Sequence, residues 1–170
     1  MKHKKIILIT SVIIICALCT LKYNSVNKDY KNYEIISKPI ILNQEFITND
    51  FKITYMNTQK NTVNINNDKY IEYQINIKMK NNTKKNMQYP SNKFYILAPN
   101  YNYNQSLYLY NKDKKQIPFH LQPNEEIEGF LIFKMPYDWN ITDDTPVKII
   151  YSESNTDKNQ TIQHILDFQK

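Results

Sequence analysis

The stretch from Lys69 to Lys80, KYIEYQINIKMK, decides the fold class of this chain. Its apolar and polar residues alternate over the whole stretch. The apolar set is Ile71, Tyr73, Ile75, Ile77 and Met79, and the polar set is Glu72, Gln74, Asn76, Lys78 and Lys80. A period of two residues puts the two sets on opposite faces of an extended chain. The stretch therefore predicts a long β-strand with one face in a core and the other in water.

Shorter runs of the same kind recur on both sides of this stretch. They cover residues 45–57, 93–97, 106–110, 127–135, 147–152 and 161–168. Polar, turn-rich segments such as 81–86 and 121–126 separate them. No amphipathic helix is long enough to cover a sheet, so we expect an all-β fold, an antiparallel β-sandwich of about seven strands.

Asparagine is expected to replace glycine in the turns of this chain. Gly129 is the only glycine among 170 residues. Turn positions with positive φ must therefore be filled mainly by asparagine, which tolerates that region better than other side chains. Pro123 and Asn124 illustrate the point, since they suit the second and third positions of a type II turn.

The N-terminus predicts export. The basic start MKHKK precedes an uncharged apolar run from Ile6 to Leu21, as in a signal peptide or an N-terminal membrane anchor. Small residues before Thr20 offer a cleavage point, and the run is slightly shorter than the roughly 20 residues of a full span, so both alternatives stay open. We expect a signal or anchor at 1–21, a polar linker at 22–33 and one β-domain at 34–170, secreted or held outside the membrane.

The cysteines and the charged residues argue against a disulfide-bonded domain, a lipid anchor and sequence-specific nucleic-acid binding. Both cysteines, Cys16 and Cys19, lie in the apolar run, so the exported part folds without disulfides. Bulky residues precede each cysteine, which disfavours a lipid anchor. The formal charge of +6 falls to +3 once the three leading lysines are set aside. Arginine is absent, which argues against sequence-specific nucleic-acid binding.

One family resemblance rests on the order of several motifs. KMKNNTKKN is followed by KFYILAPN, a variable hairpin, LQPNEEIEGFLIFKMP and VKIIYSES. This order resembles the immunoglobulin-like β-sandwich domain of unknown function found in lipoproteins and membrane-anchored secreted proteins of Gram-positive bacteria. Asn81, Asn82, Pro123, Gly129, Phe133 and Pro136 occupy the places of its motif residues. The resemblance implies an extracytoplasmic, immunoglobulin-like fold and no particular activity.

The sequence offers no recognisable catalytic group. His120 and His164 lack a second histidine at ligand spacing, and Glu125 and Glu126 face opposite ways in an extended chain. The best metal candidate is a weak calcium site at Asp138, Asn140, Thr142 and Asp144, which lacks the sharp-turn glycine and the bidentate glutamate. We expect no enzyme activity, no cofactor and no metal.

A tyrosine-rich segment is the candidate ligand site. Tyr101, Tyr103, Tyr108 and Tyr110 lie in NYNYNQSLYLYN, residues 100–111. If Leu107 and Leu109 fill the core, the tyrosines face outward beside amides and lysines, a surface suited to sugars, peptides or an anionic wall polymer. The alternative is that they are ordinary strand residues, since tyrosine favours strands. We therefore expect a binding domain for a cell-envelope polymer or protein partner, or else an assembly subunit of an envelope complex.

Overall fold

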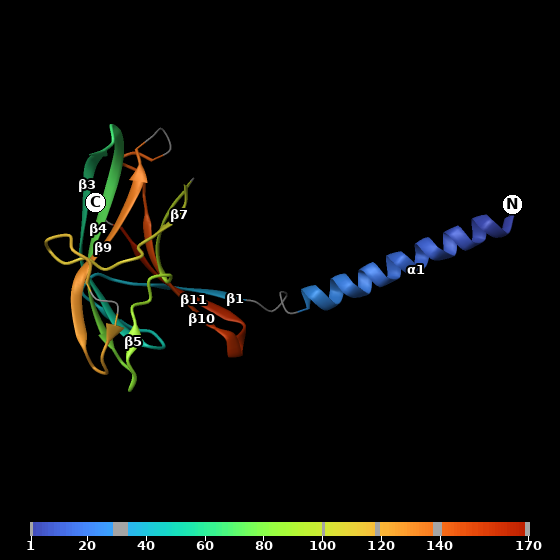
Figure 1. The fold of residues 1–170 in the computed structure, drawn as a ribbon, viewed down its shortest axis with the longest axis horizontal. Helices are drawn as coiled ribbons and strands as arrows, with labels where there is room; N and C mark the ends of the chain where they lie inside the picture. The colour runs from blue at the N-terminus through green and yellow to red at the C-terminus, as the bar shows by residue number, and fades with distance from the viewer. Residues whose placement is uncertain (1, 29–33, 100, 118–119, 138–140, 169–170) are drawn as a thin grey trace.

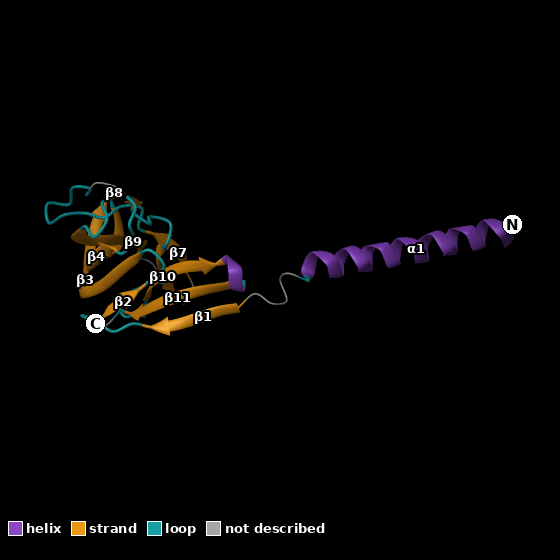
Figure 2. Ribbon diagram, turned by 90° about the horizontal axis from the view of Figure 1, so that it is seen from below, coloured by secondary structure: helices purple, strands orange, loops and turns teal. Residues whose placement is uncertain are grey.

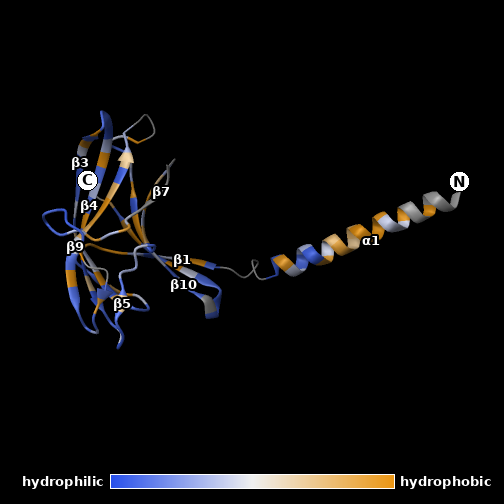
Figure 3. Ribbon diagram, in the orientation of Figure 1, coloured by the Kyte–Doolittle hydropathy of each residue, from blue (hydrophilic) through white to orange (hydrophobic). Residues whose placement is uncertain are grey.

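The computed structural model describes residues 2–28, 34–99, 101–117, 120–137 and 141–168 (Figure 1). Helix α1 (Lys2–Asn27) is followed by a domain made of strands. Among the described helices, α1 alone is long and apolar enough to cross a membrane, and a signal sequence would meet the same criteria. Hydrophobic residues recur along its length (Figure 3), and none of the segment Ile9–Asn27 is buried in the protein.

Two sheets face each other in the β-domain. The five-stranded sheet has the order β1 (Glu34–Pro39), β11 (Gln160–Asp167), β10 (Lys148–Asn155), β6 (Phe94–Ala98) and β7 (Tyr101–Gln105). The four-stranded sheet has the order β2 (Glu45–Ile47), β3 (Phe51–Ile65), β4 (Asp68–Asn81) and β9 (Glu126–Pro136). Strands β5 (Met87–Gln88) and β8 (His120–Leu121) pair separately, and a 3₁₀ turn, η2 (Thr156–Lys158), joins β10 to β11. The β-sandwich predicted from the sequence is confirmed.

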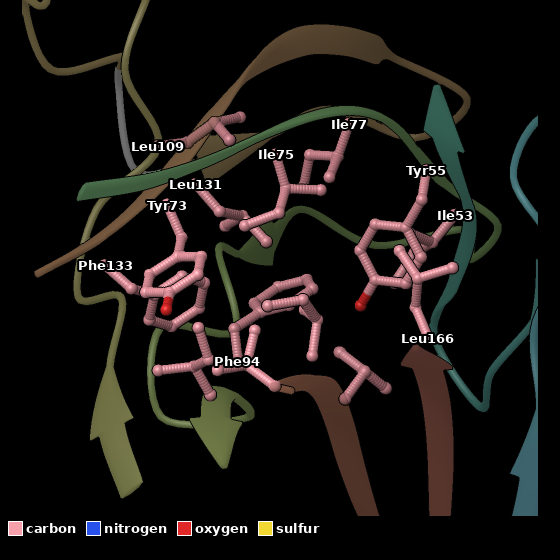
Figure 4. Packing of buried hydrophobic residues seen from close by; sticks show 14 of the residues in the cluster. Ile53, Tyr55, Tyr73, Ile75, Ile77, Phe94, Leu109, Leu131, Phe133 and Leu166 are labelled. Carbon is pink, nitrogen blue, oxygen red and sulfur yellow. The ribbon is translucent and has the colours of Figure 1, made fainter. Parts of the chain in front are cut away.

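The alternation in β4 builds the core as predicted. All five apolar residues of its inner face are fully buried. They meet the inner faces of β9 and of the five-stranded sheet, for example at Leu131, Phe133, Phe94 and Leu166 (Figure 4). Burying large apolar side chains is the main stabilising contribution to such a domain, at about 1.5 to 3 kcal/mol for each one.

Asparagine does replace glycine at the positive-φ positions. Six described residues other than glycine have positive φ, namely Asn43, Asn66, Asn67, Asn124, Asn159 and Lys114. Asn66 and Asn67 form the tight turn between β3 and β4, where both central residues need positive φ. Asn124 has φ 61° in the predicted turn, which the Glu125 amide closes by donating to the Gln122 carbonyl at 3.0 Å.

Four expectations about the strands need correction. The described residues form eleven strands, not seven. Strand β1 was not expected and pairs with β11 in parallel, so the sandwich is not purely antiparallel. Residues 106–110 are not a strand, because the strand of this region lies earlier, in β7. The run 45–57 is two strands, because the Thr48 hydroxyl accepts a bond from the Phe51 amide and bends the chain.

The N-terminal boundary also differs from the expected one. Helix α1 continues through Asn27, so the first six residues of the expected 22–33 linker are helical. The polar residues of this segment do not stop the helix, since it contains no proline or glycine and each ordinary residue costs at most about 0.7 kcal/mol relative to alanine.

Candidate functional site

The four tyrosines of the candidate ligand site lie partly in a strand and partly beyond it. Tyr101 and Tyr103 lie in β7, at one edge of the five-stranded sheet. Tyr108 and Tyr110 lie beyond that strand and are half-buried, with ring centroids 6.3 Å apart in an edge-to-face pair. Leu107 is 51% exposed and Leu109 only 2%, so the expectation that both leucines face the core is wrong.

The chain leaves β7 to reach the free edge of β9. The Tyr110 amide donates to the Phe130 carbonyl at 3.0 Å, and the Phe130 amide donates back at 2.7 Å. A Cβ at Gly129 would lie 2.6 Å from Leu109 Cγ and 2.8 Å from the Tyr110 carbonyl oxygen. The glycine therefore permits a close approach of two backbones, and the backbone of Tyr110 joins the segment after β7 to β9.

A hairpin formed by residues 110–116 then covers part of the outer face of β4. The Lys114 ammonium lies 3.0 Å from one carboxylate oxygen of Glu72, and Lys134 lies 3.5 Å from the other. Burial alone would raise the pKa of Glu72, but bonds from Gln74 and Lys114 and the two lysine charges outweigh it and lower the pKa. Glu72 is thus a buried structural carboxylate, although the sequence placed it in water.

The outer face of the five-stranded sheet carries a groove that the sequence did not reveal. It has a volume of about 650 Å³ and is lined by side chains of β6, β10 and β11 and of the turn before β6. Tyr95, Leu97 and Ile150 supply its apolar surface. Asn92, Lys93, Ser152, Ser154 and Gln163 supply its polar groups. Gln163 donates to the Tyr95 hydroxyl at 3.1 Å, which fixes the ring in the groove.

A second, more apolar hollow continues from the groove at Leu97. It has a volume of about 560 Å³ and is lined mainly by Leu97, Ala98, Pro99, Pro146, Val147 and Phe168. Lys148 and Asp167 stand at its rim, 4.0 Å apart. This hollow lies at the end of β11 opposite to Gln160, which pairs with the first residue of β1. It therefore opens at the end of the sheet away from the start of β1.

A buried acid–imidazole pair connects the two sheets at a distance from the apolar hollow. Glu153 on β10 lies 3.0 Å from His164 Nε2 on β11, and both side chains are 4% exposed. The second carboxylate oxygen accepts the Asn49 amide of the β2–β3 turn at 2.9 Å. Phe46 of β2 stacks on the imidazole at 4.8 Å. These contacts hold β2 and its turn against the five-stranded sheet.

Acid should weaken this connection. Burial would raise the pKa of Glu153, but the bonds from His164 and the Asn49 amide and the charges of His164 and Lys93 lower it overall. A carboxyl whose folded pKa is depressed stabilises the fold above its unfolded pKa of about 4.3, and this is lost as pH falls through the folded value. We expect Glu153→Gln to be less stable than wild type at pH 7 and to approach it below about pH 4.

Urea unfolding of both proteins between pH 7 and pH 3 measures this difference. Glu126→Gln is a matched control, since Glu126 makes only a half-exposed ion pair with Lys78 and such pairs contribute little. A stability gap between wild type and Glu153→Gln that stays constant down to pH 3 would contradict the assignment.

The calcium candidate gains no structural support in the described part of the chain. Asp138 and Asn140 lie outside the described residues. The Thr142 amide donates to the Thr145 hydroxyl at 2.8 Å, and the Asp144 amide points to the Thr142 hydroxyl at 3.4 Å, as in a simple local turn. No three histidine, cysteine, aspartate or glutamate side chains converge among the described residues.

Solved structures share this fold at low identity. An uncharacterised β-sandwich protein of Clostridium difficile aligns with a TM-score of 0.57 and 13% identity, over 80% of this chain and 97% of its own. A candidate lipoprotein of Bacillus subtilis, YcdA, gives 0.51 and 14%, over 74% of this chain and 39% of its own. A functionally unknown protein of Listeria monocytogenes gives 0.51 and 12%, over 74% and 80%. These likenesses establish the sandwich fold alone.

Sequence comparison identifies the family. No curated protein matches the chain significantly. The model of a family described as a domain of unknown function, DUF4352, matches residues 40–161, which include both sheets except β1 and most of β11. The chain therefore belongs to the DUF4352 family.

Proposed function

We propose that this protein is a non-enzymatic, immunoglobulin-like binding domain at the surface of a Gram-positive cell. The apolar helix α1 and the candidate lipoprotein among the structural neighbours support export and membrane attachment. The neighbours in Clostridium, Bacillus and Listeria support a Gram-positive setting. The single observation that carries a binding role is the groove on the five-stranded sheet.

The groove chemistry favours an extended, uncharged and hydroxyl-rich ligand. A half-exposed aromatic ring with hydroxyl and amide groups beside it suits the alternating apolar and polar faces of a sugar. Among the described residues that line the groove, Lys93 alone is charged; it lies 3.9 Å from Asp50 and is partly neutralised by it. We therefore propose that the ligand is a neutral glycan strand of the cell envelope, not an anionic polymer.

Retention on purified cell walls tests this proposal. Tyr95→Ala should weaken binding about tenfold, because loss of one aromatic contact costs about 1.4 kcal/mol. Tyr70→Ala is the matched control: Tyr70 is also half-buried but lies on β4 of the other sheet, away from the groove. Circular dichroism should show both variants folded. Equal retention of folded Tyr95→Ala and wild type would refute the groove as the site.

An assembly role is the second candidate function. The apolar hollow beside the groove favours it, since a hollow of that composition suits an apolar side chain of another protein. Leu97→Asp, which places a charge at the junction of groove and hollow, should then release a protein partner in crosslinking. Loss of a crosslinked protein with wall retention unchanged would favour this role over polymer binding.

A further inference from the structure

The groove and the apolar hollow beside it form one continuous channel along β10. Leu97 lines both of them and is 40% exposed where they meet. From Ser154 in the groove to Val147 in the hollow, the chain covers about 23 Å, at roughly 3.3 Å per residue. We call the groove and the hollow together the β10 channel. A single extended ligand can therefore occupy both parts of it.

The two parts of the β10 channel differ in polarity. The groove offers hydroxyl groups beside an aromatic ring, from Ser152, Ser154 and Tyr95. The hollow is lined mainly by apolar side chains, among them Pro146 and Phe168. An unsubstituted glycan matches the groove but gives the hollow no apolar contact. The ligand that matches the whole channel is a glycan with a substituent that carries apolar groups.

The walls of the hollow are fixed in place by the fold. The Phe168 amide donates to the Val147 carbonyl at 3.0 Å, and the Phe168 ring packs edge-to-face on Tyr73 with centroids 5.1 Å apart. Pro99 and Pro146 also line the hollow, and their rings restrict the backbone angle φ. A site whose walls are already in place binds a ligand without the entropic cost of ordering them.

Both signs of charge stand at the rim of the hollow. Lys148 on β10 pairs with Asp167 on β11, and their charged groups are 4.0 Å apart. Their side chains are 54% and 78% exposed, so each charge stays accessible to a ligand. An ammonium and a carboxylate side by side complement a ligand that carries both of these groups, as a short peptide does. A fatty acyl chain would use neither charge.

The position of the hollow argues against a lipid. Asp167, the last residue of β11, lines the hollow, whereas Gln160, the first, pairs with the first residue of β1. Strands β1 and β11 run side by side in the same direction (Figure 2). The hollow is therefore at the far end of the sheet from the point where the chain enters β1 after helix α1. A lipid tail held in the membrane of α1 would have to extend along the whole sheet to reach it.

We infer that the glycan bound in the groove carries a short peptide, and that the hollow is the subsite for this peptide. The sugar residues lie against Tyr95, the apolar side chains of the peptide enter the hollow, and its charged groups meet Lys148 and Asp167. The inference rests on the glycan binding proposed above and defines the ligand more closely, as a peptide-substituted wall glycan. The domain then distinguishes wall that carries peptide from wall that has lost it.

Calorimetric titration of the full-length protein in detergent with two soluble probes tests the inference. One probe is the disaccharide-peptide that a muramidase releases from purified cell walls. The other is the same disaccharide after an amidase has removed the peptide. We expect the disaccharide-peptide to bind about tenfold more tightly, since one or two buried methyl or methylene groups contribute that much. Tyr95→Ala should weaken the binding of both probes, because the ring lies in the groove.

Two variants of the hollow should remove this difference between the probes. Pro146→Asp puts a carboxylate in the wall of the hollow, and Lys148→Glu leaves two acidic groups at its rim. Pro123→Asp and Lys78→Glu are the matched controls, since Pro123 is an exposed proline of another turn and Lys78 forms an exposed ion pair on the other sheet. All four positions are exposed, so circular dichroism should show folded proteins.

The outcomes separate the peptide subsite from the glycan site. Equal affinity for the two probes, both weakened by Tyr95→Ala, would refute the peptide subsite and leave the groove as a glycan site. No binding of either probe would refute the glycan proposal and, with it, this inference. A difference that survives both Pro146→Asp and Lys148→Glu would refute the hollow as the subsite. Tighter binding of an octyl glycoside of the same disaccharide than of the disaccharide-peptide would assign the hollow to a lipid tail instead.

Discussion

Replacing Asn81 by leucine should lower the free energy of unfolding by about 4 kcal/mol, because several buried polar groups lose their partners at once. Asn81 is fully buried. Its amide nitrogen donates to the carbonyls of Lys85 at 2.7 Å, Leu121 at 3.0 Å and Gln122 at 3.1 Å, so one of its two hydrogens is shared between two carbonyls. Its amide oxygen accepts the backbone amide and the hydroxyl of Thr83, both at 2.9 Å. Leucine has a similar size but satisfies none of these groups.

Urea unfolding followed by circular dichroism measures the loss at Asn81. Asn82→Leu is the control, because Asn82 is the adjacent residue of the same type but is exposed, and surface changes usually stay within about 0.5 kcal/mol. An Asn81→Leu protein within 1 kcal/mol of wild type would contradict the assignment of Asn81 as the centre of this bond network.

Gly129→Ala should lower the free energy of unfolding by about 2 to 3 kcal/mol, and Gly129→Val by more. In most strands this change is favourable, since alanine restricts the unfolded chain more than glycine does. Here the new methyl group would lie 2.6 Å from Leu109 Cγ, 2.7 Å from Ile117 Cδ1 and 2.8 Å from the Tyr110 carbonyl oxygen. The carbonyl cannot retreat without breaking its bond to the Phe130 amide, so the segment 109–117 must shift away from β9.

Thermal and urea unfolding again provide the measurement for Gly129. Glu126→Ala, at the start of the same strand, changes an exposed side chain and should leave stability nearly unchanged. A Gly129→Ala protein as stable as wild type would contradict the close approach of residues 109–117 to β9.

Local pattern was enough to predict the elements that decide the fold. The alternation of β4 defines its own inner face, and the turns at Asn66, Asn67 and Asn124 follow from the backbone freedom of asparagine in a chain with one glycine. Both signals depend on residues that are neighbours in sequence. Both signals can therefore be recognised in the sequence without knowledge of the rest of the fold.

The features missed from the sequence all depend on distant segments. Glu72 has the sequence signature of an exposed strand residue, yet the hairpin at 110–116 brings Lys114 over it. Strand β1 is mostly exposed and carries no alternation, since pairing on one side with β11 is what defines it. The groove needs side chains from β6, β10 and β11, whose order in the sheet could not be read from pattern.

The prediction of a tyrosine-lined ligand site is limited in the same way, because contacts between distant segments cannot be read from one short stretch of sequence. Composition alone cannot tell that β7 ends at Gln105 or that Tyr110 pairs with Phe130 on the other sheet. The aromatic residue that lines the groove, Tyr95, stands in a strand that was not among the candidate binding segments. A ligand-binding role for Tyr101, Tyr103, Tyr108 and Tyr110 remains a prediction.

Photocrosslinking in intact Gram-positive cells tests the binding claim most directly. A benzophenone amino acid placed at Leu97, in the groove, should form a covalent link to wall glycan that a muramidase releases as a defined mass. The same amino acid at Tyr70, on the other sheet, should give no such product. Equal crosslinking at both positions, or none at Leu97 in a folded and exported chain, would contradict the assignment of the groove as a glycan site.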